Sequence, residues 1–309
     1  MGIPNGYNTT PSFMFSEQIA SLLGAAHTVY MVDSNAGVDT NDGMSWESCV
    51  KKMSIAMALS HADIAAADKL GYAARNVILF KGDQTATAEG EDLTKLAQKT
   101  DVIGIGSTDW KDKPQLIGNI VVGATTSYMG CKFHNIMFKG PVLVGGDIIT
   151  LTGQHGISFN NCEFMADSTT AATAAVLATA CVGLEFRKCV TKGAFSDAVI
   201  ELGAGQADDF LVEDCLIQGA NMGIDIGAAT FAVGKYGMIK NNVIASTLAC
   251  INDASNKVYV IGNRGMTLAT SGGATIAGAV VCNVQLAQDN RFTTSNKTNM
   301  VYPAQDALA

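Results

Sequence analysis

Phe133 opens the stretch FHNIMFKG (133–140), and its pattern returns as FNNCEFMA (159–166), FRKCVTKG (186–193), VEDCLIQG (212–219), IKNNVIAS (239–246) and VIGNRGMT (260–267). Each copy pairs a short apolar strand signal with two polar residues, and consecutive copies begin 26, 27, 26, 27 and 21 residues apart. A fixed period of this length is typical of solenoids, in which one supersecondary unit stacks on the next. The eighth residue of every copy is small, which predicts a tight bend once per coil.

Other strands are expected at a constant offset between these copies, at 147–150, 176–177, 198–202, 223–226 and 250–251. Less regular coils precede them as NVILFKG (76–82), DVIGIGS (101–107) and PQLIGNIVVG (114–123). The Leu-x-x-Leu-x-Leu framework of a leucine-rich repeat is missing, and a hexapeptide helix needs a coil of about 18 residues. The sequence therefore predicts an all-β fold, a right-handed single-stranded parallel β-helix.

Outside the repeats, the chain divides into an N-terminal arm, a capping helix and a C-terminal segment. Residues 1–28 contain Asn, Gly and Pro that oppose regular structure, so we expect an arm. Apolar residues at roughly helical spacing predict a capping helix at about 46–70. The β-helix is expected to span 29–268, and the Asn-, Gln- and Thr-rich residues 269–309 to serve as a capping or assembly segment.

Stacking also explains the cysteines. Successive coils lie about 4.8 Å apart, so Cys162, Cys189 and Cys215 should form one column that Asn242 and Asn263 extend. Zinc binding and disulfides are the alternatives, but no Cys-x-x-Cys pair is present. We interpret the thiols as free and buried, packing as small hydrophobic groups. No metal or cofactor site is predicted.

The charged residues give only weak candidates for catalysis. The residue after each leading apolar position should point outward, which places in one column His134, Asn160, Arg187, Glu213 and Lys240. Arg187, Glu213 and Lys240 alternate in sign and predict an ion-pair ladder, with a lyase base and its partner as the alternative. Glu201 and Asp225 should lie one coil apart, so they are either a hydrolase carboxylate pair or two surface acids.

The composition limits the classes of partner that this chain is expected to bind. The chain has 28 acidic and 20 basic residues and a net charge of −8, and we expect no nucleic-acid partner because phosphate binding needs a basic face. No apolar run is long enough to span a membrane. The first residues carry no basic region typical of a signal peptide, so folding in a reducing cytoplasm is expected.

The stretch VYMVDSNAGVDTNDGMSWESCVKKMSIAMAL (29–59) resembles the entry segment of pectate-lyase-like proteins, in which a strand ending in Val-Asp leads through a Gly-Asp-x-x-x-Gly-x-Ser loop to a capping helix. Many members of that family belong to phage particles. The resemblance implies a phage virion protein, and short length and missing catalytic motifs favour a non-enzymatic, trimeric capsid decoration or cement protein. Its expected partners are further copies of itself and the major capsid protein. The alternative is a tailspike or lyase that binds or degrades polysaccharide.

Overall fold

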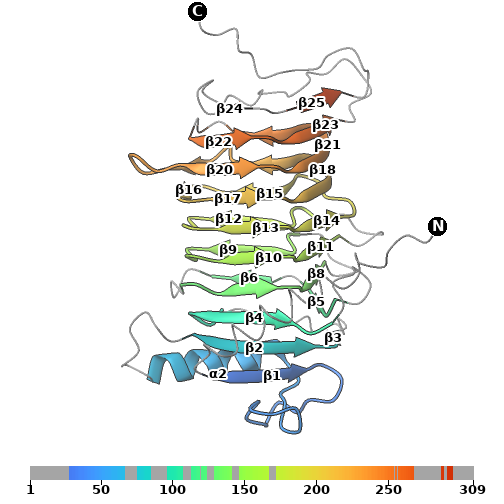
Figure 1. Ribbon diagram of the computed structural model, residues 1–309, viewed down its shortest axis with the longest axis vertical. Coiled ribbons are helices and arrows are strands. Elements are labelled where there is room, and N and C mark those ends of the chain that lie inside the picture. The colour runs from blue at the N-terminus through green and yellow to red at the C-terminus, as the bar shows by residue number, and fades with distance from the viewer. Residues whose placement is uncertain are drawn as a thin grey trace, which may run out of the picture.

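The computed structural model describes residues 28–66, 75–84, 96–106, 113–118, 120–123, 129–140, 146–166, 172–253, 255, 257–267, 287–288 and 291–294. Strands stack one above another along a single long axis, with a helix beside the first of them (Figure 1). All strand pairings given for this part of the chain are parallel, and partners are segments one coil apart in sequence. The chain is a right-handed parallel β-helix, as the repeat predicts.

One side of the solenoid is a ten-stranded sheet, here called sheet A. Its order is β1 (Val29–Asp33), β2 (Asn76–Lys81), β4 (Thr100–Gly104), β7 (Lys132–His134), β10 (Ser158–Asn160), β13 (Glu185–Arg187), β17 (Leu211–Glu213), β20 (Gly237–Lys240), β22 (Val258–Ile261) and β24 (Ala287–Gln288). Phe133, Phe159, Phe186 and Val212 share one register, which confirms the alignment of the repeats.

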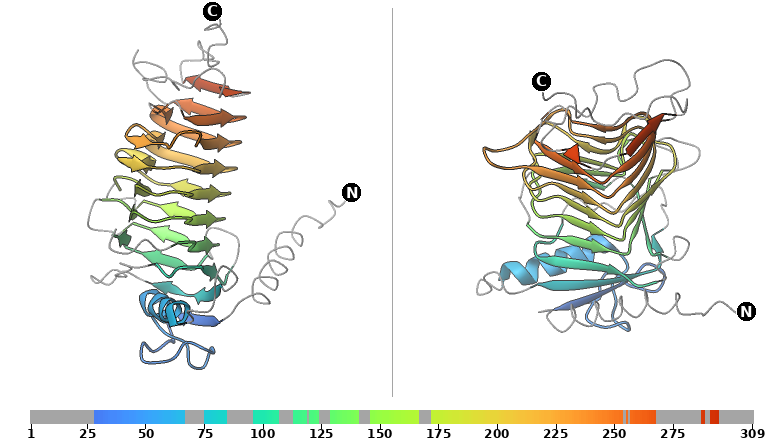
Figure 2. Two further views of the ribbon diagram at one scale, coloured as in Figure 1. Left: turned by 90° about the vertical axis from the view of Figure 1, so that its left-hand side faces the viewer. Right: turned by 45° about the horizontal axis from the view of Figure 1, so that its top comes forward.

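The other side is a thirteen-stranded sheet with two arms. The first arm holds β3 (Asp83–Gln84), β5 (Gln115–Ile117), β8 (Met137–Lys139), β11 (Glu163–Met165), β14 (Val190–Lys192), β23 (Arg264–Thr267) and β25 (Arg291–Thr294). The second arm holds β6 (Ile120–Val122), β9 (Ile149–Thr152), β12 (Val176–Thr179) and β15 (Ala198–Leu202). The long strands β18 (Leu216–Asp225) and β21 (Val243–Asn252) run through both arms, while β16 (Gly205–Gln206) and β19 (Ala229–Thr230) pair separately. Figure 2 shows the stack from the side and tilted forward, with the strands of successive coils lying one above another.

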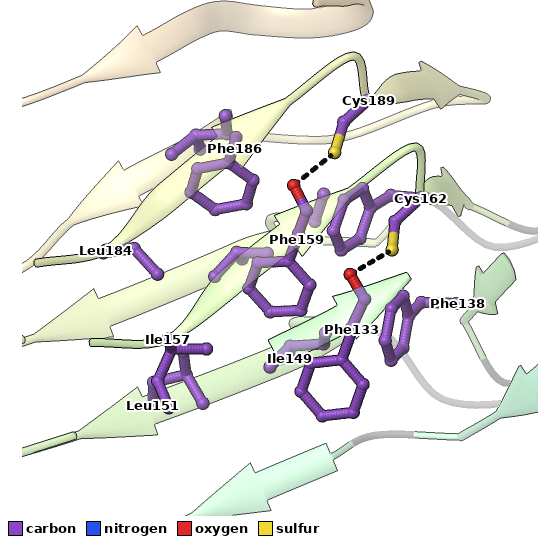
Figure 3. Packing of buried hydrophobic residues seen from close by; sticks show 14 of the residues in the cluster. Phe133, Phe138, Ile149, Leu151, Ile157, Phe159, Cys162, Leu184, Phe186 and Cys189 are labelled. Carbon is purple, nitrogen blue, oxygen red and sulfur yellow. Dashed lines mark hydrogen bonds between the residues drawn. The ribbon is translucent and has the colours of Figure 1, made fainter. Parts of the chain in front are cut away.

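The core consists of side chains that stack along the axis. Phe133, Phe159 and Phe186 lie nearly parallel, with ring centroids 5.4 and 5.2 Å apart (Figure 3). Phe138 and Phe164 form a second stack at 5.4 Å and meet Phe159 edge-on. The coil repeat therefore sets the spacing that offset ring stacking favours.

The expected cysteine column is also present, and it forms a hydrogen-bonded ladder. The Cys162 thiol donates to the Phe133 carbonyl at 3.5 Å, and the Cys189 thiol donates to the Phe159 carbonyl at 3.3 Å (Figure 3). Asn242 and Asn263 continue the column, and their amides donate to the corresponding carbonyls of the preceding coils. Within the described residues the cysteines are free and buried: Cys49, Cys131, Cys162, Cys181, Cys189, Cys215 and Cys250. Cys282 lies outside that part of the chain.

The main once-per-coil bend differs from the one expected. It lies at the second residue of the polar pair, which is left-handed in every copy: Asn135, Asn161, Lys188, Asp214, Asn241 and Gly262. Asn and Asp tolerate this conformation better than most residues, and Gly adopts it freely. The small eighth residue has a separate role at Gly193, where a Cβ would lie 2.6 Å from the Ala166 carbonyl oxygen. In the later coils Gly219 and Ser246 lie inside β18 and β21, where the pairing of the two strands shifts register between Gln218 and Ala220, so the small eighth residue marks an irregularity within a long strand.

The capping helix, α2 (Met53–Ala66), begins at Met53 rather than at about residue 46. Val50 forms a parallel bridge with Val32, so the chain is still extended there, and the Asp39 carboxylate accepts the amides of Lys51 and Lys52 just before the helix. Residues 67–70 of the expected helix lie outside the described residues. At the other end β24 pairs with β22 and β25 pairs with β23, so the solenoid continues past residue 268.

Candidate functional site

The outer face of sheet A carries the predicted charged column. Adjacent strands place Arg187 opposite Glu213 and Glu213 opposite Lys240. The Lys240 ammonium lies 2.7 Å from one Glu213 carboxylate oxygen, and the Arg187 guanidinium binds the other oxygen. Arg187 also lies 3.3 Å from Glu185. The column is therefore the expected ion-pair ladder, in which each charged group already has a partner of opposite sign.

Nearer the N-terminal end, the same face holds a second charged cluster. The Arg75 guanidinium donates to both oxygens of Asp101, at 2.7 and 3.1 Å, and also to the Gly130 carbonyl. His134 lies 3.4 Å from the same carboxylate. Burial of Asp101 raises its pKa, but the hydrogen bonds from His134 and Arg75 outweigh burial and hold the pKa below its usual value. Asp101 is thus a buried, ionised anchor for two neighbouring side chains.

The second arm carries four carboxylates. Glu201 and Asp225 are direct partners on β15 and β18, as the sequence predicts. Two hydrogen bonds hold Asp225: the Asn252 amide donates at 2.8 Å and the Gly227 amide at 2.9 Å. Burial raises the pKa of Glu201, and the negative charges of Asp197, Asp225 and Asp147 raise it further.

The pKa of Asp147 is raised as well. Burial raises its pKa, the Thr150 hydroxyl donates to one oxygen at 3.1 Å, and Asp197 adds a repulsive charge. The other oxygen of Asp147 is buried and has no hydrogen-bond partner among the described residues. The second arm therefore presents carboxylates that repel one another, with Glu201 and Asp225 on β15 and β18 and with Asp147 and Asp197 just before β9 and β15.

Glu201 and Asp225 are neighbouring carboxyl groups with different surroundings. Glycoside hydrolysis uses two carboxyl groups on a shared face, one kept protonated by its surroundings and one kept ionised. Glu201 has the raised pKa, while Asp225 accepts two hydrogen bonds. Within the described residues, no group of three or more His, Cys, Asp or Glu side chains is arranged to hold a metal ion.

Sequence reasoning missed two features. Tyr236 and Tyr259 meet at the end of sheet A with ring centroids 5.3 Å apart, and the Lys257 ammonium lies 5.6 Å from the Tyr236 ring. Lys113 is only 4% exposed and donates to the Asn161 carbonyl at 2.8 Å. The coil register offers a signal for Tyr259, which lies opposite Met238, but Lys113 precedes the regular repeats and has no such signal.

Comparison with known proteins adds little. No family model and no curated protein matches the sequence. A search of solved structures found a rhamnogalacturonan lyase, with a TM-score of 0.42 and 11% sequence identity over 89% of this chain and 90% of that one. A similarity this low carries no inference about activity. No helix in the described part of the chain is long and apolar enough to cross a membrane.

Proposed function

We propose that this chain is a non-enzymatic structural protein of a phage virion, and that it is a trimeric decoration or cement protein of the capsid. Its partners would be further copies of itself and the major capsid protein. The family resemblance of residues 29–59 supports the particle context, and the stacked core supports a rigid element.

The observation that carries the structural role is the ladder on sheet A. A lyase base needs a cationic side chain that is free to approach its substrate. Glu213 instead binds both Arg187 and Lys240, and Glu185 binds Arg187 from the other side. Pairs of this kind on neighbouring strands each contribute a fraction of a kcal/mol, so the ladder suits a scaffold.

Purified capsid shells that lack this chain provide the test. The full chain should bind them saturably, and a variant lacking residues 1–28 should bind them less well if the arm is an assembly element. Failure of the full chain to bind shells of its own phage would refute the decoration role.

A second candidate function is cleavage of a polysaccharide at Glu201 and Asp225, and the raised pKa of Glu201 favours it. Incubation with acidic polysaccharides should be followed both by reducing-end release and by unsaturated-product absorbance. Turnover that is lost in Glu201→Gln but kept in the ladder variant Glu213→Gln would establish this function and refute the first.

A further inference from the structure

The two arms of the thirteen-stranded sheet carry opposite charge. On the second arm, Asp147, Asp197, Glu201 and Asp225 are all half-buried. Its strands β6, β9, β12 and β15 contain no Lys or Arg, and neither do residues 222–225 and 249–252 of the long strands. We call this surface the acidic arm.

The first arm has the reverse balance. Its outward side carries Lys139, Lys192 and Arg264, with Lys113 buried against it. The strands of this arm contain two acidic residues, Asp83 on β3 and Glu163 on β11, and Glu163 is 1% exposed and binds Lys192 at 2.9 Å. Lys139 and Arg264 form no ion pair within the part of the chain that the structure describes, and we call this surface the basic arm. A basic surface is unexpected on a chain whose net charge is −8.

Both arms also expose apolar side chains. On the basic arm, Leu216 and Val243 face each other on adjacent strands with 38% and 48% exposure, and Met266 is 42% exposed. On the acidic arm, Val121 is 53% exposed and lies in the outward row that leads through Thr150 toward Glu201. Apolar groups together with complementary charges are the composition that protein interfaces use for affinity and register.

From this complementarity we infer that the acidic arm of one copy of the chain docks on the basic arm of a second copy. The inference rests on the proposed function, because it supplies the contact by which the trimer would form. The two docked surfaces differ, so the contact is heterologous, and such a contact closes into a ring when its rotation allows. Docking would place cations opposite four carboxylates that otherwise repel one another, which the raised pKa values of Asp147 and Glu201 reflect.

Charge reversal on each arm tests the contact. The acidic-arm variant is Asp197→Lys with Glu201→Lys, and the basic-arm variant is Lys139→Glu with Arg264→Glu. These positions avoid the Lys192–Glu163 pair and the hydrogen-bonded Asp225. Sedimentation of the full-length chains should show self-association at least about tenfold weaker for each variant, since a reversed pair opposes like charges. Circular dichroism and a thermal melt should show that both variants stay folded.

Two further measurements separate a lost contact from a damaged fold. An equimolar mixture of the two variants should form mixed pairs but not closed trimers, because one variant then has two basic arms and the other two acidic arms, and a ring of three cannot alternate them. The fourfold variant, with both arms reversed, should regain self-association. A wild-type chain that stays monomeric, or a fourfold variant that stays dissociated while folded, would overturn the inference.

The outcomes also distinguish this inference from the proposed function. A monomeric chain that still binds capsid shells would refute docking between copies and leave the decoration role standing. A chain that assembles as expected but cleaves polysaccharide would refute the structural role and leave the contact standing.

Discussion

Replacing Asn242 with alanine should lower the free energy of unfolding by about 2–5 kcal/mol, because the change removes several buried hydrogen bonds at once. Asn242 is fully buried in the column that the cysteines occupy in earlier coils. Its Oδ1 accepts the Cys215 amide at 2.8 Å, and its Nδ2 donates to the Val212 carbonyl at 3.0 Å and to Asn263 at 2.9 Å.

The magnitude follows from what alanine leaves behind. The Cys215 amide loses this acceptor inside the core, and a buried group left unsatisfied costs about 1–3 kcal/mol. The two donated bonds add about 0.5–1 kcal/mol each. The sum of these contributions gives the stated range.

Asn242→Cys is the informative companion variant. A thiol at this position can accept the Cys215 amide, as Cys215 itself accepts the Cys189 amide at 3.4 Å. It can also donate to Val212, as Cys162 donates to Phe133. We expect Asn242→Cys to lose about 1–2 kcal/mol, because sulfur is the weaker donor and acceptor. Asn160→Ala, on the outer face of sheet A, is the control and should change stability by less than about 1 kcal/mol.

Urea unfolding followed by circular dichroism measures the three variants, and native-state hydrogen exchange of the Cys215 amide reports the local effect. Exchange is needed because a solenoid can unfold in parts. Equal losses for Asn242→Ala and Asn242→Cys, or unchanged protection of the Cys215 amide in the alanine variant, would refute the ladder reasoning.

Four other tests address separate parts of the structure. Phe159→Ala, in the middle of the ring stack, should cost about 3–5 kcal/mol in urea unfolding, and a loss below about 1 kcal/mol would contradict the packing. In the dissociated chain the folded-state pKa of Glu201 is raised, so its ionisation costs stability above that pKa and the cost disappears as pH falls through it. At concentrations below self-association, Glu201→Gln should therefore raise the melting temperature near neutral pH but not in acid, and an equal effect at both would count against it. The pKa of Asp101 is lowered in the folded chain, so the ionised group stabilises the fold above its unfolded-state pKa and this stabilisation is lost as pH falls through its folded-state pKa. Asp101→Asn should therefore lower the melting temperature most near neutral pH, and a difference from wild type that grows in acid would contradict the lowered pKa. Burial raises the pKa of the Cys162 thiol to about 12, so the native thiol should resist alkylation at pH values where the urea-unfolded chain reacts, and equal rates would show that it is exposed.

The repeats made much of the architecture predictable. Because the coil length fixes which residues stack, the positions of Phe133, Phe159 and Phe186 predict the ring column, and the same spacing predicts the cysteine column and the Arg187–Glu213 pair. In each case two residues one period apart lie on adjacent strands, so the spacing in the sequence predicts the contact in space.

Features that depend on the path between strands were not predictable in this way. The helix starts at Met53 because Val50 still pairs with a strand, a tertiary contact that helical spacing does not reveal. The left-handed bend lies at Asn135 and its counterparts, the second residue of each polar pair, and not at the small eighth residue. The opposite charges of the two arms emerge only once β18 and β21 are known to run through both.

The structural role is tested most directly by locating the chain in purified phage particles with a labelled antibody and electron microscopy. The proposal predicts label at regular positions over the capsid shell, present in threefold groups and absent from the tail. Label confined to the tail tip, or particles that contain no copy of the chain, would contradict it.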